Sequence, residues 1–237
     1  MVLSEKNGMN ERLIKAISFV PKCRCMADIG SDHGYAAVYA VQNGIAETVT
    51  ATDISAPSLA KTQKITQMYG LADKITCRVG DGLKPVLPGE AQVAFIAGMG
   101  ADLIAQIIES SPDVARELDC MVLQPMNSAE PLRRRIVAAG YKIDAEGIVK
   151  DNGRFYQILK CSVGTTAISD IQYELGTYVY RERIPLCTEF IEHMLESCDN
   201  ILRYIGEEDT CLSRARTEEV LRKKEEYRRA LEWAMSE

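Results

Sequence analysis

The feature that most constrains the fold of this chain is a regular alternation of short apolar runs with segments of helical period in its first 160 residues. Apolar runs bounded by turn residues predict strands at residues 25–30, 48–54, 75–80, 92–97, 119–124, 141–149 and 154–161. Helical spacing predicts helices at residues 10–19, 34–43, 56–69, 101–109 and 128–139. Strands that alternate with helices and are apolar almost throughout are typical of a parallel sheet covered on both faces.

The last two predicted strands are joined only by the short segment Asp151-Asn152-Gly153. Asn-Gly favours a tight reversal of the chain, so the seventh strand is expected to run antiparallel to the strands before it. The sequence therefore predicts an α/β domain over residues 1–164. Its doubly wound sheet is expected to hold six parallel strands and an antiparallel seventh.

Residues 165–237 have helical period only. They predict two helices, at residues 186–205 and 212–235, with a break from Gly206 to Asp209. Two helices of similar length joined by a short turn predict an antiparallel coiled-coil hairpin as a second domain. Its many charged residues fit either a solvated helix face or a surface for a partner, and the sequence leaves both open.

Charge and cysteine content limit the class of function. The formal net charge of −6 argues against a uniformly basic nucleic-acid binder but leaves room for a local basic patch. The sequence holds neither a run of about 18 apolar residues nor an apolar leader segment, so we expect a cytoplasmic protein with no membrane association. The 8 cysteines and 2 histidines lack the spacing of a metal site, so we expect reduced thiols and no metal.

The first predicted strand ends in the run Asp28-Ile29-Gly30-Ser31-Asp32-His33-Gly34. Small residues in a strand-to-helix turn let the backbone approach a ligand closely. The spacing D-x-G-x-x-x-G differs from the dinucleotide pattern G-x-G-x-x-G. A carboxylate at position 28 repels a pyrophosphate but suits a ligand that carries an ammonium group. The turn therefore favours S-adenosylmethionine over a nicotinamide dinucleotide.

The next three predicted strands end in turns that also suit a ligand. Asp53, followed by Ile54, closes the second strand and is placed to accept both ribose hydroxyls; its alternative role is a helix N-cap. In Gly80-Asp81-Gly82 the carboxylate is placed to accept from an adenine amino group, unless the segment is an ordinary Asp-Gly turn. The fourth strand ends in Ala97-Gly98-Met99-Gly100, whose small residues would form a narrow floor for a ligand at the carboxyl edge of the sheet. Because the carboxyl ends of parallel strands meet at one edge, we expect one S-adenosylmethionine site there.

Several of these motifs together resemble those of the TrmK family. They are Asn10-Glu11-Arg12-Leu13, ADIGSDHGY at 27–35, VQNGIA at 41–46, ATDIS at 51–55, GDGL at 80–83, AGMG at 97–100, LQPMN at 123–127, Leu132-Arg133 and Gly153-Arg154-Phe155-Tyr156. The resemblance implies a bacterial tRNA (adenine-N1)-methyltransferase that acts on adenine 22, with a Rossmann-like class I sheet and a C-terminal helical hairpin. The chain departs from the family at Ala36 and Ala37, where the family usually has DHAYLP, and at Asp81, where it often has GNGL.

The loop after the fourth strand bears on the target atom. Methylation of an exocyclic amine usually relies on a (D/N)-P-P-(Y/F) loop there, and cytosine C5 chemistry needs a cysteine nucleophile. This chain has Gly98-Met99-Gly100-Ala101 instead. A ring nitrogen such as adenine N1 already has a lone pair, so it needs orientation more than it needs a base. A nearby carboxylate can then stabilise the positive charge that forms on the adenine.

Five residues of the predicted edge are candidates for a catalytic role. Asp32 is expected either to stabilise charge or act as a base, or to cap the following helix. His33 is expected to bond the donor or the target base, or else the backbone. Tyr35 either stacks on the base or packs beneath its helix. Gln124 and Asn127 are placed either to read an adenine edge or to brace their loop.

Basic residues are the candidates for contact with RNA, since phosphate contacts supply most sequence-independent affinity. They are Arg133, Arg134, Arg135, Lys142, Arg214, Arg216, Arg222, Lys223, Lys224, Arg228 and Arg229. Composition alone favours solvated helix faces for these residues, and only the family resemblance implies a tRNA partner. We expect the protein to be a monomer. Two alternatives stay open: a small-molecule or protein methyltransferase on the same fold, and a scaffold that binds donor or RNA without catalysis.

Overall fold

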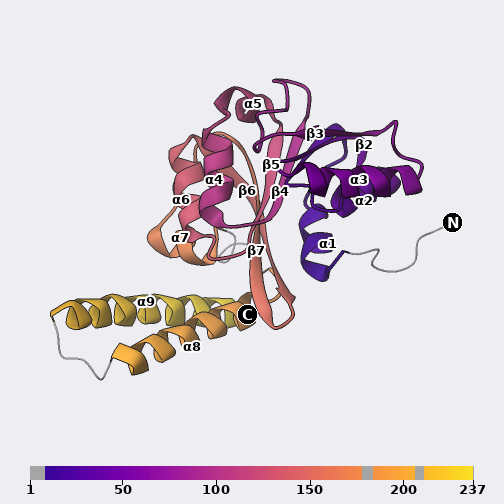
Figure 1. The fold of residues 1–237 in the computed structure, drawn as a ribbon. Helices are drawn as coiled ribbons and strands as arrows, with labels where there is room; N and C mark the ends of the chain where they lie inside the picture. The colour runs from indigo at the N-terminus through magenta and orange to yellow at the C-terminus, as the bar shows by residue number, and fades with distance from the viewer. Residues whose placement is uncertain (1–8, 178–183, 206–210, 237) are drawn as a thin grey trace. The chain divides into compact units, whose positions relative to one another are not determined.

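The computed structural model describes residues 9–177, 184–205 and 211–236 (Figure 1). The chain divides into two compact units, Met1–Thr166 and Ala167–Glu237. Each unit has its own packing and is described by itself. Within the described residues, none of the helices is both long enough and apolar enough to cross a membrane.

The first unit is built on a seven-stranded sheet with the strand order β3-β2-β1-β4-β5-β7-β6. Its strands are β1 (Cys23–Ile29), β2 (Ala46–Asp53), β3 (Ile75–Val79), β4 (Val93–Met99), β5 (Cys120–Pro125), β6 (Tyr141–Asp151) and β7 (Arg154–Val163). Strands β1 to β5 pair in parallel, and β7 pairs antiparallel with both β5 and β6. Six strands therefore share one direction and the seventh opposes them, which confirms the predicted sheet.

The reversal between β6 and β7 follows from its two central residues. Asn152 and Gly153 both have positive φ, +49° and +76°. Two consecutive residues of this kind form the tight hairpin turn that matches the twist of the flanking strands. The place of β7 between β5 and β6 was not predicted, because it depends on pairing between segments distant in the sequence.

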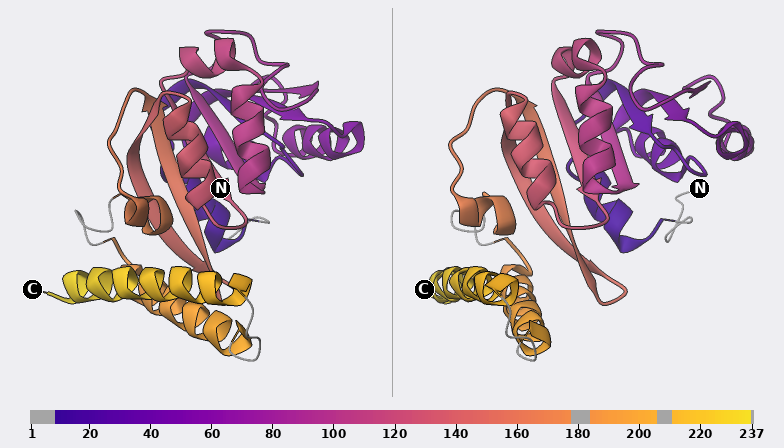
Figure 2. Two further views of the ribbon diagram at one scale, coloured as in Figure 1. Left: turned by 90° about the vertical axis from the view of Figure 1, so that its left-hand side faces the viewer. Right: turned by 60° about the vertical axis from the view of Figure 1, so that its left-hand side comes forward.

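Helices cover both faces of the sheet (Figure 2). They are α1 (Glu11–Ile17), α2 (Tyr35–Gln42), α3 (Ala56–Met68), α4 (Ala101–Glu109), α5 (Pro112–Glu117) and α6 (Glu130–Ala138). Helices α1, α2 and α3 lie on one face, and α4 and α6 lie on the other. Five of these helices agree with the predicted segments; α5, of 6 residues, is too short to show a period and was not predicted.

Strand order reverses between β1 and β4. The chain runs from β1 outward through β2 to β3, and then returns to place β4 on the other side of β1. Asp28 near the end of β1 lies between Ala51 of β2 and Phe95 of β4. The turns that follow these strands therefore meet at one edge, at the switch point where open α/β sheets bind ligands.

The second unit consists of α7 (Asp170–Leu175), α8 (Cys187–Ile205) and α9 (Cys211–Met235). Helices α8 and α9 agree with the predicted segments and pack side by side (Figure 1). Lys224 of α9 is paired with Asp199 of α8, and Lys223 Nζ lies 2.7 Å from Glu174 Oε1 of α7. The predicted break from Gly206 to Asp209 lies outside the described residues, and the coiled-coil geometry stays a prediction.

A buried ion pair joins α6 to β6 and corrects one sequence-based expectation. Arg133 Nε lies 2.6 Å from Glu146 Oε1, and the two side chains are 1% and 3% exposed. Arg133 shares the buried face of α6 with Leu132 and Ile136. Its guanidinium cannot reach a phosphate, so Arg133 is wrong as an RNA-binding residue.

We expect Arg133→Met to lower the free energy of unfolding by about 3–5 kcal/mol, because it leaves the carboxylate of Glu146 buried without its cation. The double variant Arg133→Met/Glu146→Met should regain most of this loss. Arg134→Met is the matched control, since Arg134 forms an exposed pair with Glu130 on the same helix. Urea unfolding measures all three; a double variant no more stable than Arg133→Met would contradict the assignment.

Candidate active site

A cavity of about 320 Å³ opens at the carboxyl edge of the sheet, where β1 and β4 end. Its lining comes from α1, from β1 and the turn that follows it, from the start of α2, and from β4. The lining residues are Arg12, Leu13, Asp28, Gly30, Ser31, Asp32, His33, Tyr35, Ala36, Phe95, Ala97, Gly98 and Met99. Among the predicted site residues, those of the turn after β1 and of the end of β4 come together in this cavity.

The turn after β1 owes its shape to three residues with positive φ. Gly30, His33 and Gly34 have φ values of +72°, +64° and +67°. A Cβ added to Gly30 would lie 2.0 Å from Met99 Cε, so glycine there allows the first and fourth turns to touch. His33 is strained in this region, at a cost of order 1–3 kcal/mol. Its ring stacks on Tyr35 with centroids 5.7 Å apart.

Asp28 and Ser31 are the buried polar groups of the β1 side of the cavity. Burial raises the pKa of Asp28 to about 6; the Ser31 hydroxyl partly offsets the shift, and the negative charge of Asp53 adds to it. Ser31 Oγ nevertheless completes no hydrogen bond of normal geometry within the described residues. A desolvated carboxylate beside an orphaned hydroxyl fits a ligand group that is cationic and donates hydrogen bonds, such as an ammonium.

The second turn keeps a carboxylate oxygen available. Asp53 Oδ1 accepts from the Ser55 amide at 2.7 Å, and Ser55 in turn caps α3 by accepting from the Ser58 amide at 3.3 Å. Ser55 is thus the cap of α3 in place of Asp53, and Asp53 Oδ2 has no hydrogen bond within the described chain. Ile54 beside it is 76% exposed, so an apolar side chain lies at the same edge.

In the third turn Asp81 is engaged by a neighbour. Lys84 Nζ lies 2.5 Å from Asp81 Oδ2, and both side chains are about half exposed. Gly82 has a φ of +59°, and a Cβ there would lie 2.8 Å from Ile107 Cγ2. The turn is therefore packed closely against α4. A ligand that binds the carboxylate of Asp81 would have to compete with Lys84 for it.

Asp32 does not cap the helix that follows it. The N-cap of α2 is Gly34, and no side chain caps that helix. The carboxylate of Asp32 is instead 63% exposed, 3.6 Å from His33 Nε2 and 3.9 Å from Lys61 Nζ. The structure thus leaves the helix-cap role without support, and Asp32 lies in the cavity lining.

The side chains of Gln124 and Asn127 both accept hydrogen bonds from neighbouring segments at the carboxyl edge of the sheet. Gln124 is fully buried, and its Oε1 accepts from Arg12 Nη1 and, at 3.2 Å, from the Gly98 amide. It therefore cannot read an adenine edge directly, and that expectation was wrong. Asn127 is exposed, and its Oδ1 accepts from the Ala101 amide at the start of α4 at 2.8 Å. This bond leaves the amide nitrogen of Asn127 available at the surface.

Arg12, from the motif Asn10-Glu11-Arg12-Leu13, also lines the cavity, although it was not predicted to be a site residue. Asn10 caps α1 by accepting from the Leu13 amide at 3.0 Å. The resulting helix places Arg12 on its buried face with Ala16 and Ile17. The signal was present, because a charged residue four positions before a buried alanine lies on the apolar face of the helix.

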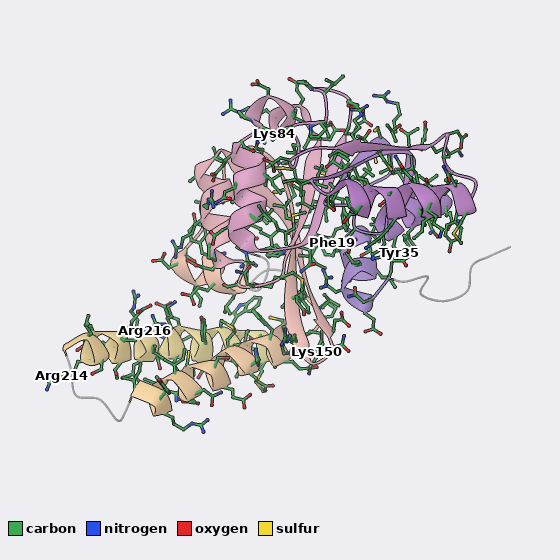
Figure 3. All side chains as sticks on the ribbon, viewed as in Figure 1. Phe19, Tyr35, Lys84, Lys150, Arg214 and Arg216 are labelled. Atoms are coloured by element: carbon green, nitrogen blue, oxygen red, sulfur yellow. The ribbon has the colours of Figure 1, made fainter. Side chains whose placement is uncertain are left out.

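Most of the predicted RNA-binding residues are at the surface. In Figure 3 Arg214 and Arg216 lie in the first two turns of α9. Both are exposed, as is Arg222, whereas Lys223 and Lys224 are partly buried in ion pairs within their own unit. Arg134 pairs with Glu130 on α6. Among the described residues no group of three or more His, Cys, Asp or Glu is arranged to hold a metal ion.

Comparisons with known proteins agree that this chain is similar to methyltransferases. Residues 9–159 match the model of a methyltransferase domain. The tRNA (adenine(22)-N(1))-methyltransferase of Bacillus subtilis is 34% identical over 156 residues, which span 66% of this chain and 66% of that protein.

Solved structures extend the likeness to most of the chain. The crystal structure of the B. subtilis M1A22 tRNA methyltransferase TrmK has a TM-score of 0.84 and 27% identity, and covers 94% of this chain and 98% of that one. Streptococcus pneumoniae Sp1610, in complex with S-adenosyl-L-methionine, has a TM-score of 0.82 and 26% identity, with coverage of 94% and 99%.

Asp28→Asn should stabilise the fold in a pH-dependent way. A carboxyl whose pKa is raised on folding contributes stability below its unfolded pKa and loses it as the pH rises through its folded pKa, here about 6. The asparagine variant should gain about 2–3 kcal/mol at pH 8 and about half of that at pH 5. Chemical unfolding at both pH values measures this, with the exposed Asp113→Asn as control. A gain equal at the two pH values would refute the buried, titrating carboxyl.

Proposed function

The chain belongs to the TrmK family of methyltransferases, and from this premise we propose that it methylates N1 of an adenine in tRNA, with S-adenosylmethionine as the donor. The adenine is that of position 22, the one named for the B. subtilis relative. The proposal rests mainly on the cavity at the carboxyl edge of the sheet. Its lining includes the buried Asp28 and the Ser31 hydroxyl, which has no hydrogen-bond partner among the described residues, and both suit a cationic group of the ligand.

The donor is proposed to lie along the ends of β1, β2, β3 and β4. Asp28 and Ser31 would hold its ammonium group, and the free oxygen of Asp53 would accept from its ribose. The exposed side chain of Ile54 and the turn at residues 80–82 would flank its adenine. Residues 30–34 and 97–100 would form the floor beneath it. When bound, the donor supplies a methyl group that is activated by a sulfonium.

The residues on the acceptor side have to orient the adenine rather than deprotonate it. N1 of a neutral adenine holds a lone pair in the plane of the ring, so the site must align this lone pair with the methyl group. Attack places positive charge on the adenine. We propose that Asp32 stabilises that charge, because its carboxylate is exposed in the cavity lining, near His33 and Lys61. Tyr35 and the amide nitrogen of Asn127 are proposed to contact the base.

The second unit is proposed to bind the body of the tRNA. Arg214, Arg216 and Arg222 are exposed on α9, as phosphate contacts require. The protein is proposed to act on its tRNA substrate as a monomer. Because N1 already has a lone pair, we propose that no metal takes part, and with tRNA as the substrate we propose that the reaction takes place in the cytoplasm.

Asp32→Asn is expected to lower the single-turnover rate of tRNA methylation by about 30- to 1000-fold, or about 2–4 kcal/mol. Donor affinity should stay within about twofold, because the interaction is made mainly in the transition state. Asp113→Asn, an exposed aspartate on α5, serves as the control. A rate within about threefold of wild type would remove charge stabilisation by Asp32 from the account.

Replacing Arg214, Arg216 and Arg222 together with glutamine should weaken tRNA binding. It should also reduce the slope of log affinity against log salt concentration by about 2–3, since each lost phosphate contact removes about one unit. Donor affinity should not change. The matched control is Lys22→Gln/Arg24→Gln/Arg116→Gln, three exposed cations at the opposite edge of the sheet. Equal salt slopes for the two triple variants would mean that α9 does not contact the tRNA.

A further inference from the structure

Arg12 is a buried cation of the cavity wall that the proposed function leaves unused. The residue is only 9% exposed and lines the cavity. Its Nη1 donates to Gln124 Oε1, and within the described residues its guanidinium forms no ion pair and no second hydrogen bond. A guanidinium carries five N–H donors in a planar fork, so most of the donors of Arg12 have no acceptor among the described residues.

The side chain is held firmly in this place. The guanidinium carbon lies 5.5 Å from the centroid of the Tyr156 ring, which attracts the cation through its π face. Gln124, which accepts from Arg12, also accepts from the Gly98 amide at 3.2 Å. A Cβ at Gly98 would lie 3.7 Å from Arg12 Nη1, so the guanidinium sits directly against the fourth turn. Arg12 is thus fixed to the floor on which the donor is proposed to lie.

No carboxylate of the described residues forms an ion pair with the buried guanidinium of Arg12. Burial lowers the pKa of Arg12, while Tyr156 and Asp151 act in the opposite direction without forming an ion pair with it. Asp28, which also lines the cavity, is likewise buried and forms no ion pair within the described residues. An isolated buried charge is costly unless a partner arrives to neutralise it. Among the described residues, the cavity therefore holds one buried cation and one buried carboxyl group that form no ion pair.

We propose that Arg12 binds an oxyanion in this cavity and so fixes the geometry of methyl transfer. The proposal rests on the proposed function, which supplies two sources of such a group. One is the carboxylate of the donor, whose ammonium would lie at Asp28. The other is a phosphate beside the target adenine. Both present paired oxygens that match the fork of a guanidinium, which a lysine ammonium cannot reproduce.

The test compares Arg12→Gln and Arg12→Lys with wild type. Calorimetry measures the binding of S-adenosylmethionine and of its decarboxylated analogue, and steady-state kinetics measure KM for tRNA. Lys15→Gln is the control, an exposed cation one turn further along the same helix. Thermal midpoints establish that each variant is folded.

If the donor carboxylate is the partner, wild type should bind S-adenosylmethionine about 10- to 100-fold more tightly than the decarboxylated analogue. Arg12→Gln should abolish this preference, and Arg12→Lys should restore only part of it. If a phosphate is the partner, donor binding should stay within about twofold, while KM for tRNA should rise about tenfold or more.

A folded Arg12→Gln protein that matches Lys15→Gln in donor preference and in KM for tRNA would overturn the proposal. The comparison of the two donors in wild type needs no variant, so misfolding of Arg12→Gln would not remove the test. Failure of the proposed function would look different: wild type would leave tRNA unmodified, whereas the binding measurements on Arg12 could still be made.

Discussion

The parallel pairing of β1 with β4 determines where every functional group of the first unit lies. It reverses the strand order at Asp28 and brings the turns after both strands into contact, with Met99 filling the space that a side chain at position 30 would need. That contact requires glycine at position 30. Later in the same turn His33 and Gly34 have positive φ, Asp32 is exposed, and His33 stacks on Tyr35. The cavity is thus a consequence of the topology, and its chemistry follows from which residues occupy the two turns.

The buried charged residues fall into two groups, one that stabilises the fold and one that lines the cavity. Arg133 and Glu146 are buried together, each with the other as partner, and they tie α6 to the sheet. Asp28 and Arg12 are buried as well, yet neither forms an ion pair within the described residues. A fold optimised for stability alone would pair or remove such groups. Their retention in one cavity at the edge of the sheet, beside an orphaned Ser31 hydroxyl, is what a site for a ligand with both charges requires.

Local sequence patterns predicted most of the elements, because apolar period and turn residues act over a few positions. The Asn152-Gly153 reversal and the helices at residues 187–205 and 211–235 are examples. What the sequence did not reveal depends on contacts between distant segments: the insertion of β7 between β5 and β6, the burial of Arg133 against Glu146, and the capture of Gln124 by Arg12. The short helices α5 and α7, of 6 residues each, carry too few positions to show a period.

The central claim is that this cavity transfers a methyl group to N1 of one adenine in tRNA. The most direct measurement is mass mapping of modified nucleosides in unmodified tRNA after incubation with the protein and isotopically labelled S-adenosylmethionine. The account predicts one labelled 1-methyladenosine, located at position 22, and no label in tRNA that carries another base there. Label on an exocyclic amine, on another nucleotide or on the protein alone would contradict it.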